Sequence, residues 1–281
     1  MMFWKSTYNE FIKIAAKPRS YIGVGAITLI VGIILFAMKA DGMSFISFVT
    51  QPFEQALSFE GNILNGNLIA FIILQMLIIH VPLLIALVTG DLVSGEGAMG
   101  TIRLLLTKPI SRTSILFSKY LAGCAYTFII LLWLGFLALV VGKMLFGSGD
   151  LMVLNSDGLI VLQEKDLAWR FLSGFSMAYL SLVMIATLSL TLSCFSENSI
   201  GPIVSTMAII IIFTIIGALD VPVLQKVQPF LFTTHMVTWR NFFEDPLPVG
   251  KIVTSASILL VHIVALLSIA VYKFNRKDIL S

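Results

Sequence analysis

Charged residues are scarce in this sequence. Only 12% of its 281 residues are Asp, Glu, Lys or Arg, whereas 58% are hydrophobic. Soluble globular domains carry about 25% charged residues. Half of that proportion, together with several long apolar runs, excludes an ordinary soluble domain and predicts an integral membrane protein. The net charge of +3 is also too small to suggest a nucleic-acid partner.

Cysteine and catalytic motifs are scarce as well. The two cysteines, Cys124 and Cys194, are expected at different depths of the bilayer, which argues against a disulfide between them. The sequence has no Gly-x-x-x-x-Gly-Lys-Ser/Thr phosphate-binding loop, no zinc motif and no convincing nucleophile–base pair. We therefore expect neither catalysis nor a bound cofactor or metal in this chain.

Six apolar runs are long enough to cross the hydrocarbon core of a membrane, which takes about 20 residues. Each run must satisfy its own backbone in lipid, so each is predicted to be a helix. The runs are continuous rather than alternating, which excludes a β-barrel. The sequence thus predicts one all-α integral membrane domain over residues 1–281. The predicted spans are 20–38, 67–90, 114–142, 168–195, 200–219 and 251–272.

The distribution of basic residues predicts the orientation in the membrane. Placing both termini inside leaves 11 of the 18 basic residues, but only 5 of the 15 acidic residues, on the cytoplasmic side. Cytoplasmic segments of membrane proteins are enriched in Lys and Arg. We therefore expect both termini to be cytoplasmic, in agreement with the even number of spans.

The first 19 residues are amphipathic and do not form a span. Aromatic and aliphatic residues recur there at helical spacing, with Lys5, Lys13 and Lys17 elsewhere around the helix. This pattern is typical of a helix that lies in the membrane interface, and Pro18 would bend the chain into the first span. A cytosolic helix packed on a partner is the alternative.

Two segments on the outer side are too apolar to be free loops. Residues 39–66 are expected to form an amphipathic helix on the outer surface. Residues 221–250 contain four prolines among many aromatic residues. That segment is too broken to span, and we predict a re-entrant or interfacial segment between spans 5 and 6.

A polar island at residues 91–112 interrupts the apolar runs. Its charged residues are costly to place in lipid, and its glycines permit a tight turn. Residues 101–106 are expected to be helical, with leucines that can pack on a flat apolar patch. Pro109 would stop this helix and Ser111 would cap the next one. The island is therefore interpreted as a short helix held crosswise beneath the membrane, an ordinary surface loop being the alternative.

The island resembles the segment after the second span in ABC-2 type permeases, the membrane subunits of one class of ATP-binding-cassette transporters. The family pattern is a Glu, a Gly-Thr pair, a leucine run and Pro-x-Ser-Arg, followed by a Lys at the start of the third span. The ending 272–279 is also similar to the family's C-terminus. The chain looks closest to the short branch that includes the permease of the nitrous oxide reductase maturation system. The matching residues of the island are Glu96, Gly100, Thr101, Leu104, Leu105, Leu106, Pro109, Ser111, Arg112 and Lys119.

The resemblance implies several partners. The island would be a coupling helix that docks into a separate ABC ATPase subunit, and that subunit would bind ATP and magnesium. Glu197 and Asn198 would form a second, smaller contact. Two permease copies, identical or closely related, would assemble with two ATPases in the cytoplasmic membrane of a prokaryote, surrounded by lipid. The docking residues would be Asp91, Glu96, Gly97, Gly100, Thr101, Arg103, Leu104, Leu105, Pro109 and Arg112.

Two histidines and a proline are candidates for a pathway through the membrane. His80 and His262 lie near the middle of predicted spans, where ionisable residues are functional candidates by default. A helix-to-helix hydrogen bond explains either histidine equally well, and without a cysteine or carboxylate nearby they make a poor metal site. Pro82 frees a backbone carbonyl in the preceding turn and is expected to bend its span.

The sequence is thus interpreted as the permease subunit of an ABC-2 type exporter. ATP hydrolysis by the partner would drive either the export of a substrate or the transmission of force to an extracytoplasmic partner. Two alternatives stay open: a secondary transporter driven by an ion gradient, and a membrane scaffold or assembly factor. No residue identifies the substrate.

Overall fold

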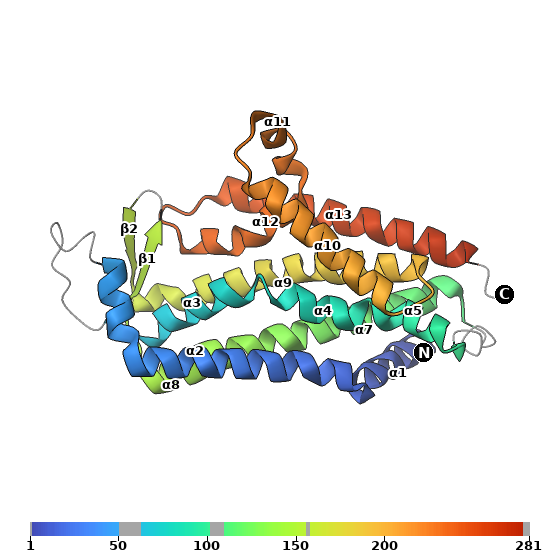
Figure 1. The fold of residues 1–281 in the computed structure, drawn as a ribbon, viewed down its shortest axis with the longest axis horizontal. Coiled ribbons are helices and arrows are strands. Elements are labelled where there is room, and N and C mark those ends of the chain that lie inside the picture. Colours follow the sequence, from blue (N-terminus) through green and yellow to red (C-terminus); the bar gives the residue numbers. More distant parts are fainter. Residues whose placement is uncertain (1, 51–62, 102–109, 156–157, 278–281) are drawn as a thin grey trace.

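The protein is an elongated bundle of helices (Figure 1). The computed structural model describes residues 2–50, 63–101, 110–155 and 158–277. The prediction of a mainly helical multi-pass membrane protein is confirmed. Both termini lie at one end of the bundle, which we call the termini end, and a β-hairpin lies at the opposite, hairpin end. Six helices in the described ranges are long and apolar enough to span a membrane: Pro18–Ser44, Val81–Ala98, Arg112–Phe146, Glu164–Phe195, Ile200–Ala218 and Val249–Arg276.

The first two helices meet at a bend. Helix α1 covers Met2–Ala16 and α2 covers Pro18–Thr50. The hydroxyl of Ser20 donates to the carbonyl of Ile14 and closes the bend. Helix α1 exposes Trp4 and Tyr8 and buries Glu10 against the bundle. Helix α2 continues beyond the predicted limit of residue 38 and kinks at Asp41, where the backbone leaves the helical region.

The second predicted span is broken, which corrects the expectation of one helix over 67–90. Helix α3 covers Gly66–Leu77, α4 covers Val81–Thr89 and α5 covers Asp91–Ala98. The break precedes Pro82 because proline has no N–H to donate to the carbonyl of the preceding turn, and its ring crowds that carbonyl. The bend expected at Pro82 is therefore a full interruption of the helix.

The next two long helices are joined by an unpredicted β-hairpin. Helix α7 (Arg112–Gly135), a π-helical stretch (Phe136–Val141) and α8 (Gly142–Phe146) run as one span past its predicted end. Strands β1 (Leu151–Asn155) and β2 (Gly158–Leu162) then pair antiparallel at the hairpin end. Helix α9 (Glu164–Phe195) packs against α4, α5, α7, α10 and α13 and forms the centre of the bundle.

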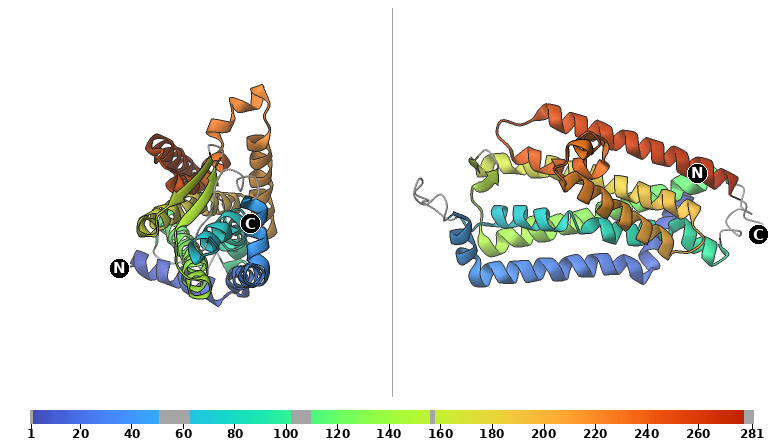
Figure 2. Two further views of the ribbon diagram at one scale, coloured as in Figure 1. Left: turned by 90° about the vertical axis from the view of Figure 1, so that its left-hand side faces the viewer. Right: turned by 45° about the horizontal axis from the view of Figure 1, so that its top comes forward.

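The remaining elements belong to the C-terminal third. Helices α10 (Ile200–Ala218) and α13 (Val249–Arg276) lie within a few residues of their predicted limits. Between them lie α11 (Pro222–Gln225), a 3₁₀ turn (Gln228–Phe230), α12 (Phe232–Met236) and the 3₁₀ helix η4 (Val237–Phe243). Helix α11 projects sideways from the bundle (Figures 1 and 2).

The broken segment is anchored by aromatic packing rather than by regular helices. Trp239 and Phe243 are buried, and their rings lie 5.6 and 5.1 Å from the ring of Phe71. Phe171 of α9 lies 4.9 Å from Phe243. The expectation that residues 221–250 are too broken to span and too apolar to be a free loop is confirmed.

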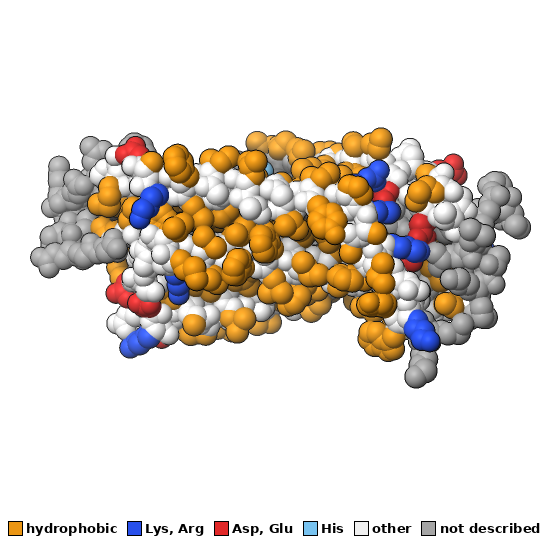
Figure 3. Space-filling view, turned by 90° about the horizontal axis from the view of Figure 1, so that it is seen from below, with side chains coloured by type: hydrophobic (Ala, Val, Ile, Leu, Met, Phe, Trp, Pro, Cys, Tyr) orange, Lys and Arg blue, Asp and Glu red, His pale blue; other side chains and the backbone are white. Residues whose placement is uncertain are grey.

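The surface separates apolar from charged residues along the long axis. Figure 3 shows a belt of hydrophobic side chains in the middle of the bundle, with the Lys, Arg, Asp and Glu side chains of this face near the two ends. A belt of this kind suits a bilayer, in which apolar surface lies in the hydrocarbon and charges lie at the interfaces. Cys124 and Cys194 are both free thiols, so no disulfide joins them.

Candidate functional site

Three helices meet at the termini end in a closed ring of charges. Glu10 and Lys13 come from α1, Glu96 comes from α5, and Lys119 comes from α7; we call these four residues the charge ring. Lys13 Nζ lies 2.7 Å from Glu10 Oε1 and 2.8 Å from Glu96 Oε1. Lys119 Nζ lies 2.8 Å from Glu10 Oε2 and 2.7 Å from Glu96 Oε2. Each carboxylate thus bridges both ammonium groups, and the ring is electrically neutral.

The charge ring is largely removed from solvent. The side chain of Lys119 is 0% exposed, and those of Glu10 and Glu96 are 4% and 7% exposed, whereas that of Lys13 is 44% exposed. Burying a charge is tolerated only when the charge is paired with good geometry. The ring therefore fixes the relative positions of α1, α5 and α7, because moving one helix away would leave a buried charge unpaired.

The protonation of Lys13 follows from its neighbours. Partial burial disfavours the charged ammonium, but the carboxylates of Glu10 and Glu96 outweigh that effect and raise the pKa of Lys13 above its ordinary value. Lys13 is consequently charged at neutral pH, as the closed ring requires.

A second group of charges joins α5 to the bend between α1 and α2. Asp91 lies 2.6 Å from Lys17 Nζ and 3.0 Å from Arg19, and we call these three residues the Asp91 cluster. Asp91 thus connects α5 to the bend and to the first turn of α2.

Gly95 is required by the position of Asp91. A Cβ atom at Gly95 would lie 2.2 Å from Asp91 Oδ1, well inside the distance at which atoms collide. At Gly97, by contrast, a Cβ would meet nothing within 4 Å. The expected tight turn does not occur at these two glycines, since both lie inside α5. The turn comes later, at Gly100, whose φ of +68° favours glycine.

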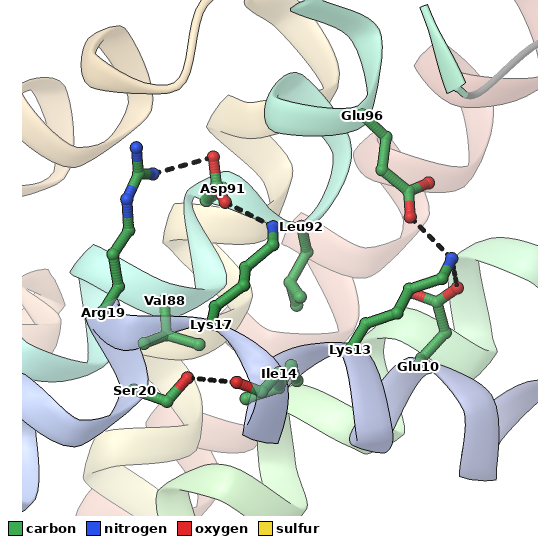
Figure 4. A pocket seen from close by; sticks show the side chains of 10 residues that line it. All are labelled: Glu10, Lys13, Ile14, Lys17, Arg19, Ser20, Val88, Asp91, Leu92 and Glu96. Atoms are coloured by element: carbon green, nitrogen blue, oxygen red, sulfur yellow. Dashed lines mark hydrogen bonds and ion pairs between the residues drawn. The ribbon is translucent and has the colours of Figure 1, made fainter. Parts of the chain in front are cut away.

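The two charge groups border one small cavity. Figure 4 shows Lys17 and Arg19 directed at Asp91 on one side, and Lys13 between Glu10 and Glu96 on the other. The cavity has a volume of about 20 Å³, which is room for about one water molecule. It is too small for an organic substrate. The site is consequently a mechanical junction between helices rather than a binding pocket.

Serines of α9 hold α5 from the opposite side. The hydroxyl of Ser193 accepts hydrogen bonds from the backbone N–H groups of Val93 (3.2 Å) and Ser94 (2.8 Å). The N–H of Val93 belongs to the first turn of α5, where a helix offers no carbonyl partner of its own. Ser189 donates to the carbonyl of Ala86, near the end of α4. These small polar residues of α9 thus support its close packing against α4 and α5.

The predicted docking residues fall into different environments. Asp91 and Glu96 are buried and paired within the chain. Gly97, Gly100 and Thr101 lie at the end of α5, and Thr101 is exposed. Arg103, Leu104, Leu105 and Pro109 lie outside the described residues, as does the helix expected over 101–106 beyond its first residue.

Arg112 and the predicted second contact also make bonds within the chain. Arg112 donates to the backbone carbonyls of Asn275 and Lys277, and so ties α7 to the end of α13. The amide oxygen of Asn198 accepts from Gly201 N (2.7 Å) in the first turn of α10. Glu197 is exposed. Ser111 caps α7 through the N–H of Ser114, as predicted.

The candidate pathway residues do not form one site. His80 is exposed at the helix break, and its Nδ1 lies 2.7 Å from the carbonyl of Met76 in the preceding helix. His262 makes the same kind of contact with Ile258, at 2.8 Å. No group of three or more potential metal ligands occurs among the described residues.

Several residues of the site escaped the sequence analysis. The sequence pattern predicts only the polar face of an interfacial helix for Lys13 and Lys17, and it indicates no role for Glu10 or Arg19. Their partners lie far along the chain: Glu10 and Lys119 are 109 residues apart. The sequence did contain one signal for this site. Lys119, Glu10 and Glu96 lie near the ends of apolar segments, where each charge needs an opposite charge beside it. His235 was also missed; it lies between the Ser255 hydroxyl and the Pro229 carbonyl, each at 2.9 Å.

Comparison with known proteins gives a family but no activity. The chain is 24% identical over 199 residues to "Uncharacterized protein YhcI" of Bacillus subtilis (strain 168), which covers 69% of this chain and 63% of YhcI. The chain thus spans less than two thirds of the length of that relative. Residues 25–280 match the family described as "Protein of unknown function (DUF2705)". Since this match extends over most of the sequence, the chain belongs to the DUF2705 family.

Proposed function

We propose that this chain is the membrane subunit of an exporter of the ABC-2 type, worked by a separate ABC ATPase that binds ATP and magnesium. The functional assembly would contain a second copy of the chain or a close paralogue. Movement of the ATPases would be converted either into export of a substrate or into force on an extracytoplasmic partner. Under this proposal the chain performs no catalysis itself and lies in the cytoplasmic membrane with both termini inside.

The observation that carries the proposal is the rigid junction around α5. The charge ring joins α5 to α1 and α7, and Ser193 joins it to α9. The segment that links α5 to α7 begins at the end of α5. Because Glu96 of α5 and Lys119 of α7 both belong to the charge ring, the helices at the two ends of this segment are held by the same junction. A push on residues 97–111 would consequently move α1, α5 and α7 together. Two-state switching by a partner needs such a stiff element, since a flexible loop would absorb the displacement.

The structure changes which residues are suited to contact an ATPase. Asp91 and Glu96 are internal, so we assign them to the junction rather than to the docking surface. Met99, which is 61% exposed, lies at the end of α5 beside the exposed Thr101. An exposed methionine is well suited to docking on a partner that moves, because its flexible side chain adapts to the shape of an apolar groove. Glu197 supplies a charged contact in the neighbouring turn.

A single substitution tests the docking surface. Met99→Asp should abolish co-purification with the ABC ATPase of the proposed complex, and should abolish stimulation of its ATP hydrolysis, because a charge would enter an apolar contact. The protein should insert and melt as the wild type does, since Met99 is exposed. Pull-down, ATPase assays and thermal unfolding of the complex measure these effects.

The matched control is Met43→Asp at the hairpin end. Met43 is 65% exposed, so the two substitutions are similar in type and in side-chain exposure. We expect Met43→Asp to keep both co-purification and stimulation. Equal behaviour of the two variants, or an unaltered interaction in Met99→Asp, would contradict the docking assignment.

The buried ionisable residues also favour a second candidate, a carrier driven by an ion gradient. Lys119 is fully buried between two carboxylates, and such groups mark proton pathways in many transporters. Purified protein in vesicles that contain the pH indicator pyranine would decide between the two. We expect no proton flux above that of protein-free vesicles. A gradient-driven flux that Lys119→Met abolishes would favour the carrier instead.

A further inference from the structure

The β-hairpin at the hairpin end has an open edge and an open apolar face. Leu151, Val153 and Leu162 face the bundle and are at most 8% exposed. On the opposite face the register places Met152 beside Val161, and Leu154 beside Leu159. Leu154 and Val161 are 50% and 55% exposed. The hairpin thus has apolar side chains on both faces, and the described part of the chain buries only the face that contains Leu151, Val153 and Leu162.

The hairpin is held rigidly to the helices. The side-chain amide of Asn65 donates to the carbonyl of Asp150 (2.8 Å), and that of Asn67 donates to the carbonyl of Gly149 (2.7 Å). A Cβ at Gly66 would lie 2.6 Å from Lys143 Cα, so the start of α3 and the end of α8 are in direct backbone contact. The base of the hairpin is consequently a fixed platform.

The register shows which backbone groups are unpaired. Asn155 and Gly158 flank a two-residue loop, and the residues that close such a loop form a hydrogen-bonded pair. In an antiparallel pair, residue pairs that are hydrogen-bonded alternate with pairs that are not. Leu159 and Val161 belong to the pairs that are not hydrogen-bonded, so their N–H and C=O groups point away from β1. Within the described part of the chain no hydrogen bond reaches these groups.

The position of β2 restricts what can pair with it. In Figure 1, β2 lies on the side of β1 away from the bundle, whereas β1 contacts α3. The free edge therefore faces away from the membrane belt. A second copy with the same orientation in the same membrane would present its own edge in the same direction, so the two edges cannot meet. Lipid lies beside the belt and not beyond the end of the bundle.

The edge also lacks the protection that exposed strands normally carry. Soluble proteins shield such edges with lysine, proline or a bulge. Neither strand contains a charged residue or a proline. The charges that border the hairpin are instead mostly acidic: Asp150, Glu164 and Asp166 against the single Lys165. The edge is suited to an extended apolar segment with basic flanks.

We propose that the free edge of β2 is a docking strand, which binds an extended apolar segment with basic flanks from a polypeptide on the side of the membrane opposite the termini. The bound segment would add a third strand through hydrogen bonds to Leu159 and Val161, and its apolar side chains would lie beside those of Leu159 and Val161. Binding by strand addition takes its affinity from main-chain hydrogen bonds and its specificity from alternate side chains. This inference does not depend on the proposed transport function.

The test uses the full chain in lipid nanodiscs and a fluorescent peptide, acetyl-Lys-Val-Thr-Val-Thr-Val-Lys-amide. We expect saturable binding by fluorescence polarisation, together with slower hydrogen exchange in residues 158–162. Val161→Pro removes an outward N–H without removing a bond inside the hairpin, and should weaken binding about tenfold or more. Val161→Ile is the matched control and should bind as the wild type does.

A second comparison leaves the protein unchanged. The same peptide with N-methyl groups on alternate amides cannot donate to β2 and should lose its binding. Absence of saturable binding, equal binding of the methylated peptide, or wild-type binding by Val161→Pro would each overturn the proposal. Quenching of a Val161→Trp variant by brominated lipid would overturn it too, because lipid would then cover the edge.

Discussion

At the scale of single residues, Lys119 is the most constrained charge in the described chain. It is fully buried and its two partners, Glu10 and Glu96, come from different helices. Removing one partner of a buried ion pair is far more costly than removing both, because the remaining charge stays desolvated. The charge ring should therefore respond to substitutions in a strongly non-additive way.

The first prediction concerns this non-additivity. Lys119→Met should lower the free energy of unfolding by roughly 3–5 kcal/mol, since Glu10 and Glu96 would share only Lys13. Adding Glu96→Gln to Lys119→Met should restore part of the lost free energy of unfolding, because the two charges that remain in the ring, Glu10 and Lys13, form a neutral pair. Unfolding in detergent micelles, followed by tryptophan fluorescence, measures both. A double variant less stable than Lys119→Met would refute the ring as a coupled unit.

The second prediction compares two glycines of α5. Gly95→Ala should destabilise the protein by roughly 1–3 kcal/mol, because the new methyl group collides with the Asp91 carboxylate held by Lys17. Gly97→Ala has open space and should be neutral or stabilising by up to about 1 kcal/mol. Thermal unfolding of both variants is sufficient. Similar losses of stability in both variants would mean that the general effect of alanine in a helix, and not the contact with Asp91, determines the stability of α5.

At the scale of elements, the stability of α5 depends on α9. Helix α5 is only eight residues long, and helices this short are marginal without tertiary contacts. Its first turn is capped by Ser193 from another helix rather than by a neighbouring side chain. The element adjoining the proposed docking surface is thus ordered by packing.

The third prediction follows from this cap. Ser193→Ala removes the hydroxyl that accepts from the buried N–H groups of Val93 and Ser94, and should cost roughly 1–3 kcal/mol. Hydrogen exchange should rise within residues 91–98 more than elsewhere, because the loss is local to α5. Ser257→Ala is a suitable control, as that exposed hydroxyl bonds only within its own helix. Uniform exchange changes, or none, would argue against the cap.

The elements also show which sequence signals were reliable. Pro18, Pro82 and Ser111 each mark a helix boundary because their effect is local: a missing N–H or a capping hydroxyl acts within one turn. The glycines of the island were less informative. Gly95 relieves a side-chain contact and only Gly100 adopts a positive φ, and both outcomes depend on neighbours that the local sequence does not specify.

At the scale of the whole molecule, the orientation in the membrane links the junction to the hairpin. The charge ring lies at the termini end and the docking strand at the hairpin end, so the two proposed contacts belong to opposite sides of the membrane. The excess of basic residues near the termini predicts that the termini end is cytoplasmic.

The fourth prediction tests this orientation. In a background with Cys124 and Cys194 replaced by alanine, Val161→Cys should react with a membrane-impermeant maleimide in intact cells. Glu197→Cys should react only after the cells are permeabilised. Both side chains are exposed, so access across the membrane decides the result. The reverse labelling pattern would invert the topology and assign the docking surface to the wrong side.

The sequence by itself determined the class of the protein and most of its spans. Apolar length is a property of the chain, and lipid accepts a long apolar run only as a helix, so α9, α10 and α13 were predictable. Only the tertiary structure decided which polar residues are buried and paired and which are exposed. Asp91 and Glu96 are internal rather than offered to a partner because cations distant in the sequence surround them. The environment of a charge depends on what folds against it, which no local pattern contains.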